Sequence, residues 1–347
     1  MSETAVSRRF TKVLAKKNFC ANTAVSVPGT WQAGFHPWGR LLLLMILFML
    51  IGTFASGCSV RAAAVDKLGD ALAGGGTAFA SDSDPELVKA AVPFSLKLME
   101  SLLAERPRHR GLLLAASRGF TQYTYAFVHQ DADEREDEDW EASGMLRARA
   151  RNLYLRARDY GLRGLEVEHA GFGKALRDRP GDAVRVAHRD DVPFLYWTAV
   201  AWAAAISVSK SDPDLVADLP FVEALIDRAL ELDEAYDNGA IHGFLIGFES
   251  ARAGATGNPM TRARQHFGRA MELSGGGQAA PLVSLAESVS ITGQDRAEFE
   301  SLLTRALAIN VNARTEWRLA NLVMQRRARW LLFRTDRLFC GTGRAER

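Results

Sequence analysis

The sequence predicts an all-α protein made of degenerate helical hairpin repeats that form one helical body. Residues that favour the first turn of a helix recur along residues 81–340, and apolar residues follow them at steps of three and four. Runs that alternate apolar and polar residues, the pattern of a strand, are missing from this part of the sequence. The third observation is an internal repeat, described below at its place along the chain.

Residues 1–57 are predicted to form a signal peptide with a long basic leading part. Their apolar run, LLLLMILFMLIGTF, extends from residue 41 to residue 54 and is shorter than the roughly 18 residues of a spanning helix. Basic residues precede the run and the small residues ASG follow it, as in a segment that signal peptidase removes. The rest of the chain is therefore expected outside the cytoplasm.

Cys58 directly follows these small residues, an order that resembles the lipobox of bacterial lipoproteins. The resemblance implies that Cys58 carries a diacylglyceryl group and starts the mature chain, whose acyl chains would hold it to a membrane without a span. Ala55 stands where the pattern usually has leucine. Ser59 after the cysteine favours the outer membrane, on the periplasmic side of the envelope. An uncleaved anchor with an incidental cysteine is the alternative.

Charge and cysteine content exclude several classes of function. Residues 58–347 contain 37 basic and 40 acidic residues, a balance that argues against nucleic acid as a partner. Cys20 leaves with the signal peptide, so Cys340 stands alone beside the lipidated Cys58 and no disulfide is expected. No cysteine and histidine spacing fits a metal site, and we expect no metal and no cofactor.

Helix starts define the body in order after a lipidated tether or first helix over residues 58–80. Asp84 is a predicted N-cap, followed by proline and by apolar residues on one face, and Pro93 predicts a kink or a break within that helix. Asn258 is a second N-cap of the same kind. Asp295, with Glu298 three residues on, has the spacing of a capping box.

The internal repeat aligns DRALELDEAY (227–236), GRAMELSGGG (268–277) and TRALAINVNA (304–313) without gaps, and a weaker copy is ESLLAERP (100–107). Each of the three has a small residue three positions after a larger apolar one, namely Ala229, Ala270 and Ala306. Small residues at this place suit the second helix of a tetratricopeptide hairpin, whose helices pack closely. We therefore predict stacked helical hairpins with loops of uneven length.

Two segments are not explained by the repeat. RGFTQYTYAFV (118–128) places aromatic residues on one helical face, and PFLYWTAVAWAAAISVSKS (193–211) is apolar nearly all round, which predicts a helix buried on every side. Apolar pockets are lined by such residues, and so are ordinary cores. The predicted ligand-binding residues, with plain core as the alternative, are Tyr123, Phe127, Tyr154, Trp197 and Trp202.

The search for catalytic chemistry finds no motif. G-x-S-x-G, H-E-x-x-H and the phosphate-binding G-x-x-x-x-G-K-[ST] are absent, so we predict that the protein is not an enzyme, an unrecognised hydrolase being the weakest alternative. The acidic run DADEREDEDWE (131–141) lacks the glycine and the spacing of a calcium loop and is interpreted as a solvated start of a helix. His242 is expected to be a hydrogen-bonded interior group.

Long stretches resemble the TatT component of TRAP-type transporters, the lipoproteins that contain tetratricopeptide repeats and accompany a periplasmic solute-binding protein. They are PFSLKLMESLLAERPRHRGLLLAASRGFTQYTYAFV, LYLRARDYGLRGLE, DVPFLYWTAVAWAAAISVSKSDPDLVADLPFVEALIDRALELD and LANLVMQRRARWLL, within residues 60–339. The resemblance implies a homotrimer, contact with the solute-binding partner, and an apolar pore or groove in each protomer.

The predicted function is therefore an accessory lipoprotein subunit of a TRAP-type uptake system. It would bind the solute-binding protein and a small hydrophobic or organic-acid ligand. The alternative is a general envelope scaffold that binds proteins through its repeats. In this scheme the helical domain covers residues 81–340, and residues 341–347 form a C-terminal tail.

Overall fold

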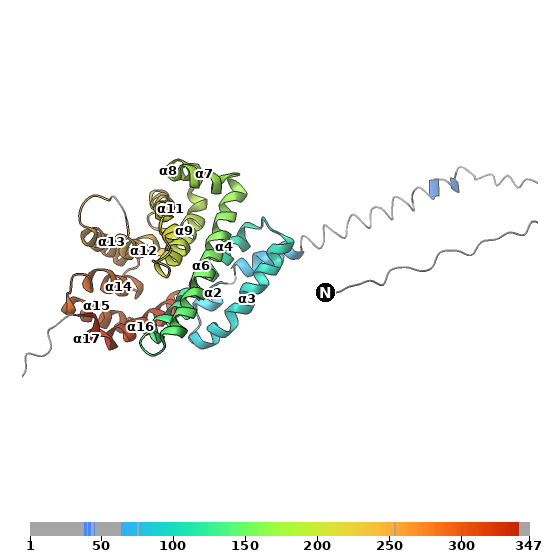
Figure 1. Ribbon diagram of the computed structural model, residues 1–347. Helices are drawn as coiled ribbons and strands as arrows, with labels where there is room; N and C mark the ends of the chain where they lie inside the picture. The colour runs from blue at the N-terminus through green and yellow to red at the C-terminus, as the bar shows by residue number, and fades with distance from the viewer. Residues whose placement is uncertain are drawn as a thin grey trace, which may run out of the picture. The chain divides into compact units, whose positions relative to one another are not determined.

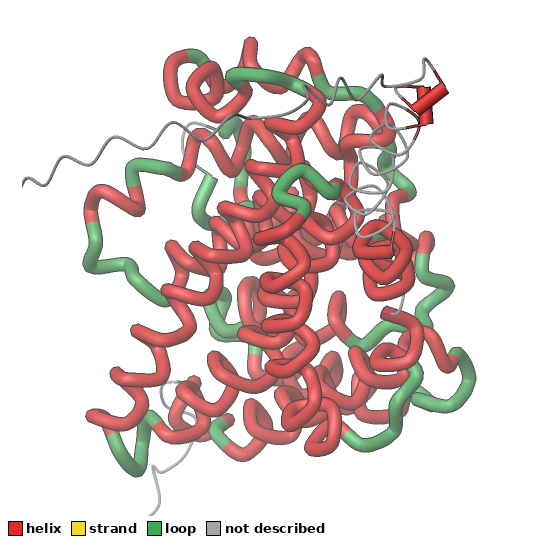
Figure 2. Tube along the Cα trace, turned by 90° about the vertical axis from the view of Figure 1, so that its right-hand side faces the viewer, coloured by secondary structure: helices red, strands yellow, loops and turns green. Residues whose placement is uncertain are grey.

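The computed structural model describes residues 38–39, 41–42, 45, 64–74, 76–252 and 255–339. The chain divides into two units, Met1–Gly57 and Cys58–Arg347, and the fold below is that of the second unit. Every regular element among its described residues is helical, which confirms the predicted fold class (Figures 1 and 2). Cys58, most of the signal-peptide segment and the C-terminal tail lie outside the described residues, so the predictions made for them stay predictions.

The α-helices are α2 (Gly76–Ala80), α3 (Pro85–Glu105), α4 (Arg110–Tyr123), α5 (Gln130–Arg135), α6 (Trp140–Glu168), α7 (Phe172–Asp178), α8 (Pro180–Ala183), α9 (Val192–Ser207), α10 (Pro213–Val216), α11 (Leu219–Leu232), α12 (Ala240–Phe248), α13 (Pro259–Leu273), α14 (Ala280–Leu285), α15 (Arg296–Ala308), α16 (Arg318–Phe333) and α17 (Thr335–Leu338). Two segments are π-helical, η1 (Thr124–His129) and η5 (Ala286–Ser290). The 3₁₀ segments are η2 (Val184–Val186), η3 (Arg189–Asp191), η4 (Tyr236–Asn238) and η6 (Thr315–Trp317).

Helix α9 is the centre of the first half of the body. Its residues are apolar nearly all round, and α4, α6 and α11 pack against it (Figure 1). Leu195, Ala199 and Ala205 have no exposed surface, as a helix surrounded by other helices requires. The prediction from PFLYWTAVAWAAAISVSKS, a helix buried on every side, is confirmed.

Small residues let α6 approach its neighbours closely. A Cβ atom on Gly161 would lie 2.1 Å from Thr198 Oγ1 in α9 and 3.1 Å from Ser117 Oγ in α4. A Cβ on Gly164 would lie 1.9 Å from the ring of Phe194. Any side chain at either glycine would force these helices apart. The body has two apolar cores, the first mainly from α3, α4, α6, α9 and α11 and the second mainly from α13, α14, α15 and α16, and the two glycines set the spacing of the first.

Local start signals correctly located several helices. The side chain of Asp84 accepts hydrogen bonds from the amides of Glu86 and Leu87, and Asn258 caps α13 in the same way. Asp295 caps α15, but Glu298 does not complete the predicted capping box, because its carboxylate binds Arg264 and Ser290. Of the kink or break predicted at Pro93, the break is wrong, and the kink stays a prediction.

Helix α3 runs without interruption from Pro85 to Glu105 and contains Pro93 in its interior. A proline there costs about 3 kcal/mol because it removes one helical hydrogen bond and crowds the preceding turn. Burial of Val88, Leu96 and Met99 in the first core offsets this cost. Packing of the apolar face therefore decides the length of α3.

The three copies of the sequence repeat occupy equivalent places. They form the C-terminal ends of α11, α13 and α15, and a further helix follows each one. Ala229, Ala270 and Ala306 are at most 1% exposed, as expected of positions where helices pack closely. Hairpin geometry of tetratricopeptide type stays a prediction, because α12 and α14, which follow the first two copies, are short, although α16 after the third is not.

Helix α16 hydrogen-bonds the ends of two repeat copies. The amide of Asn321 donates to the carbonyl of Gly277 (3.0 Å) and its oxygen accepts from the amide of Ala279 (2.9 Å). Gln325 Nε2 donates to the carbonyls of Ala306, Leu307 and Ile309 at 2.9–3.2 Å. Both side chains are at most 5% exposed. They pair carbonyls that the end of a helix otherwise leaves without partners.

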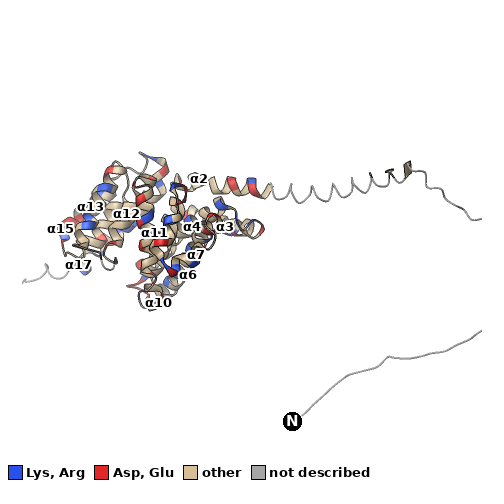
Figure 3. Cartoon of the chain, turned by 90° about the horizontal axis from the view of Figure 1, so that it is seen from above, with Lys and Arg blue, Asp and Glu red and all other residues tan. Residues whose placement is uncertain are grey.

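Of the helices within the described residues, none has both the length and the apolar character that crossing a membrane requires. Acidic and basic residues are mixed along the helices of the body (Figure 3).

Candidate functional site

The five aromatic residues predicted to contact a ligand lie in three different settings, and each is at most 9% exposed. Tyr123 and Phe127 are in ring contact, with centroids 5.7 Å apart. Tyr154 lies in α6, where its hydroxyl is 3.2 Å from His129 Nδ1. Trp197 and Trp202 lie in α9, and Trp202 Nε1 donates to Asp218 at 3.0 Å. Their burial is that of core residues, and a ligand role for them stays a prediction.

Arg327 of α16 is the centre of a polar cluster between the two halves of the body. Its guanidinium donates to both oxygens of Glu287, at distances of 2.6–2.9 Å, and to Gln130 Oε1 (2.7 Å) and Asp133 Oδ2 (3.1 Å). The ring of Tyr125 lies with its centroid 6.0 Å from the guanidinium carbon. Because the side chain of Arg327 is only 12% exposed, these partners replace water around its charge.

Both π-helical segments supply residues to this cluster, Tyr125 and His129 from η1 and Glu287 from η5. A π-helical turn accommodates one more residue than an α-helical turn and so turns the side chains that follow toward new neighbours. Such turns are frequent at functional sites. Here the two π-helical segments lie about 160 residues apart in the sequence, and both place side chains beside Arg327.

Burial and charge shift the protonation of this cluster. Burial raises the pKa of Tyr125 to about 12 and lowers the pKa of His129. Burial opposes the charge of Arg327, but the carboxylate of Glu287 and the other acidic neighbours outweigh it, and the pKa of Arg327 lies well above its usual value. At neutral pH the cluster thus contains a fixed arginine cation and a neutral tyrosine.

A second set of ion pairs extends the cluster across α5 and α16. Arg326 donates to Asp131 Oδ1 (2.8 Å) and Glu134 Oε1 (3.0 Å), and Lys89 of α3 donates to Asp131 Oδ2 (2.8 Å). The acidic run 131–141 was interpreted as a solvated start of a helix, and this is wrong for its first residues. Their carboxylates are 12–27% exposed because basic residues of other helices cover them.

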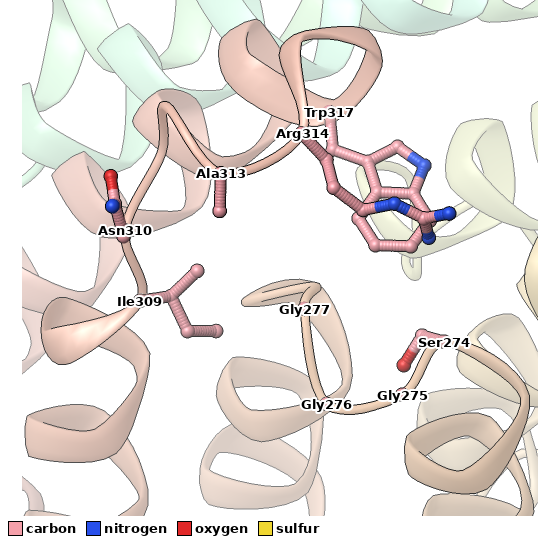
Figure 4. A pocket seen from close by; sticks show the side chains of 9 residues that line it. All are labelled: Ser274, Gly275, Gly276, Gly277, Ile309, Asn310, Ala313, Arg314 and Trp317. Carbon is pink, nitrogen blue, oxygen red and sulfur yellow. The ribbon is translucent and has the colours of Figure 1, made fainter.

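A cavity of about 400 Å³ opens between the ends of α13 and α15 (Figure 4). Its lining is Ser274, Gly275, Gly276, Gly277, Ile309, Asn310, Ala313, Arg314 and Trp317. Ile309 and Ala313 face the hollow, and the guanidinium of Arg314 lies over the indole of Trp317, 4.1 Å from its centroid. A Cβ on Gly277 would lie 2.7 Å from the same indole, so only glycine fits beside it.

This cavity can hold a small apolar group beside one cation. Most of its lining is apolar, and Arg314, which contacts Glu316 at 3.3 Å, is its basic side chain. A smaller hollow of about 320 Å³ lies on α6 around Tyr160, whose hydroxyl donates to Glu100 at 2.8 Å. None of the five predicted aromatic residues lines either cavity.

Reasoning from sequence missed the two arginines of α16 that form ion pairs with several carboxylates. Arg326 and Arg327 belong to the stretch QRRAR, a basic interruption of an apolar helix, and this interruption was the available signal. His242 was expected to be a hydrogen-bonded interior group, and this is confirmed by its contacts with His266 and Glu234. Within the described residues, no group of three or more acidic, cysteine or histidine side chains is arranged to hold a metal ion.

Comparison with known proteins identifies related sequences. A family model described as TRAP transporter T-component matches residues 81–339. A protein of Treponema pallidum (strain Nichols), described as an uncharacterized protein, is 31% identical to this chain over 259 residues. The aligned region covers 73% of this chain and 80% of that protein. The family match begins three residues before the N-cap of α3 and ends one residue after α17.

Proposed function

The chain belongs to the family of TRAP transporter T-components, and from this we propose that it is an accessory subunit of a TRAP-type solute uptake system. The observation that carries the proposal is the family match over residues 81–339, which spans the described helical body from α3 to α17. The family is a transporter component and not an enzyme family. A general envelope scaffold is the alternative function.

We propose that the body binds the periplasmic solute-binding protein of that system and assembles with copies of itself, as a trimer by resemblance. Exposed apolar side chains support a role in association. Phe94 on α3 is 74% exposed, Trp140 on α6 is 72% exposed, and Phe333 on α16 is 85% exposed. Apolar side chains that form a contiguous exposed patch commonly mark the surfaces through which proteins associate, and these three are the candidates for such a patch.

The proposed ligand is a small hydrophobic molecule or an organic acid in an apolar pore. The cavity beside Arg314 supports this chemistry, since it offers an apolar lining and one guanidinium. Tyr123 and the other four predicted aromatic residues are the rival location. Binding of a hydrophobic fluorescent probe to Trp317→Ala and to Tyr123→Ala tests which location is used, because only the variant in the true site should bind the probe more weakly.

We also propose that the protein is a lipoprotein of the outer membrane, facing the periplasm, with Cys58 as its acylated N-terminus. The support is the sequence order of apolar run, small residues and cysteine. Cys58→Ser should release the body from membranes or leave it unprocessed. An intact mass that retains residues 1–57 without lipid in the wild-type protein contradicts this proposal.

The uptake function is tested by searching the neighbouring genes for a TRAP solute-binding protein and measuring its association with this chain. Light scattering should show a complex, and Phe94→Glu should weaken association while the melting temperature stays unchanged. Ser101→Glu is the matched control on the same helix, because Ser101 is also exposed. If no such gene lies nearby and no complex forms at any concentration, the scaffold function is favoured instead.

A further inference from the structure

His242 of α12 and His266 of α13 form a ring pair at the junction of the two cores. Their Nδ1 atoms lie 2.8 Å apart, and their ring centroids are 5.1 Å apart. The outer nitrogen of each ring faces a carboxylate: His242 Nε2 is 3.2 Å from Glu234, and His266 Nε2 is 3.6 Å from Glu249. The four side chains therefore form one line, Glu234, His242, His266 and Glu249.

The number of protons in this line follows from its geometry. Glu234 accepts a hydrogen bond from His242, so His242 Nε2 carries a hydrogen, whereas His266 Nε2 lies beyond hydrogen-bond distance of Glu249 and carries one only when its ring is charged. The two Nδ1 atoms at 2.8 Å need one further hydrogen between them, because two lone pairs repel at that distance. The neutral pair thus holds two ring protons, and a third proton, on His266 Nε2, gives the pair one positive charge. A fourth proton would place two N–H groups against each other.

The charged groups around the pair come from three segments. Arg269 of α13 hydrogen-bonds to Glu234, which lies between α11 and η4, and this bond holds the pKa of Glu234 below its usual range. Arg252 and Arg262 both contact Glu249, whose surface is 2% exposed. Both carboxylates therefore keep a cation partner in mild acid, while Arg269 and Arg252 oppose additional positive charge on the rings.

Burial lowers the pKa of both rings, and His242 adds to this effect on His266. The side chain of His242 is 7% exposed and that of His266 is 19% exposed, so water cannot separate two charged rings without movement of the helices. The same helix pair connects the two apolar cores, since Leu245 of α12 belongs to the first and Ile246 to the second.

We propose that His242 and His266 form an acid-sensitive junction: the ring pair accepts one shared proton and no more, and the contact between α12 and α13 opens when both rings are protonated. Below pH 6.5 an unfolded chain protonates both histidines, whereas the closed pair holds one proton fewer. Folding stability is therefore present above about pH 6.5 and is lost as the pH falls below it, by about tenfold in the folding equilibrium constant per pH unit.

Two measurements on the full chain test the junction. In ¹⁵N spectra of labelled histidine side chains, the pair should keep one shared proton, and gain no second one, at pH 5.5. In urea unfolding from pH 8 to pH 5, the wild type should lose stability more steeply than His242→Gln/His266→Gln. His188→Gln is the matched control and should retain the wild-type slope.

Several results would overturn the proposal. If both rings become fully protonated independently near pH 6.5, the pair does not share a proton. This result is obtained on the wild type, so it does not depend on whether the double variant folds. Equal slopes for the wild type and a folded double variant remove the effect on stability. A rise of the wild-type midpoint on adding Ni²⁺ at pH 7.5, lost in the double variant, makes the pair a metal ligand set instead.

Discussion

Replacement of Gln325 by leucine tests how the end of α15 is held. The Gln325 amide donates to the carbonyls of Ala306, Leu307 and Ile309, and the residue is 5% exposed. Its two N–H groups can fully satisfy two of these carbonyls at one time. Leucine fills a similar volume, so the change removes the donors without leaving a large cavity.

The expected loss follows from those unpaired acceptors. A buried carbonyl without a partner costs about 1–3 kcal/mol, but Ile309 is half-buried and water can reach its carbonyl. One fully buried acceptor and one hydrated acceptor give a loss of about 2 kcal/mol for Gln325→Leu. Gln325→Glu should lose more at neutral pH, because a carboxylate would face three carbonyls at the negative end of a helix.

Urea unfolding followed by circular dichroism, on a chain that begins at Ser59, measures these losses. Part of the loss in Gln325→Glu should return in acid, because a protonated carboxyl can donate one hydrogen bond. Gln265→Leu is the matched control: Gln265 is exposed on α13, and its replacement should change stability by less than about 0.5 kcal/mol. Wild-type stability in both Gln325 variants would refute the role of this amide.

Gly161→Ala should destabilise the body by about 1–3 kcal/mol, because its Cβ would lie 2.1 Å from a hydroxyl oxygen of α9. Gly144→Ala is the control and should be neutral or stabilising, because no atom lies within 4 Å of the added Cβ. Thermal melting compares the two variants. Arg327→Met should cost about 3–5 kcal/mol, since it leaves buried carboxylates unpaired, and a smaller loss than for Arg327→Lys would contradict this. Trp197→Ala should lower stability by about 3–5 kcal/mol if Trp197 is a core residue. Tyr123→Ala should instead weaken binding of the hydrophobic fluorescent probe if Tyr123 faces a ligand. Unchanged probe affinity in folded Tyr123→Ala assigns Tyr123 to the core.

Features that depend on neighbouring residues in the chain were predictable from the sequence. Asp84 and Asn258 cap their helices through side chains that reach amides two or three residues away, so the local sequence contains the whole interaction. The burial of α9 was predictable for a similar reason, since a helix apolar on all sides has no stable place in water. The family resemblance, confirmed by the match over residues 81–339, extended the prediction of a helical fold to the whole body.

Features that depend on distant residues were not predictable. Nothing near Asp133 in the sequence shows that Arg327, 194 residues later, will cover it. The extra residue in η1 is accommodated because Tyr125 and His129 find partners in α16 and α6, and periodicity along the sequence does not contain that information. Pro93 is the opposite case, in which a strong local signal was outweighed by burial of the helix.

The pairing of α5 with α16 has a consequence for synthesis of the chain. Arg326 and Arg327 leave the ribosome after the rest of the body from α3 to α15 has been made. Until then, Asp131 has only Lys89 and Asp133 has only Arg147 as an ion-pair partner among these basic residues, so burying the two carboxylates is less favourable than in the complete body. A nascent chain that ends before α16 is therefore expected to hold α5 less firmly, and docking of α5 with α16 becomes a late step of folding.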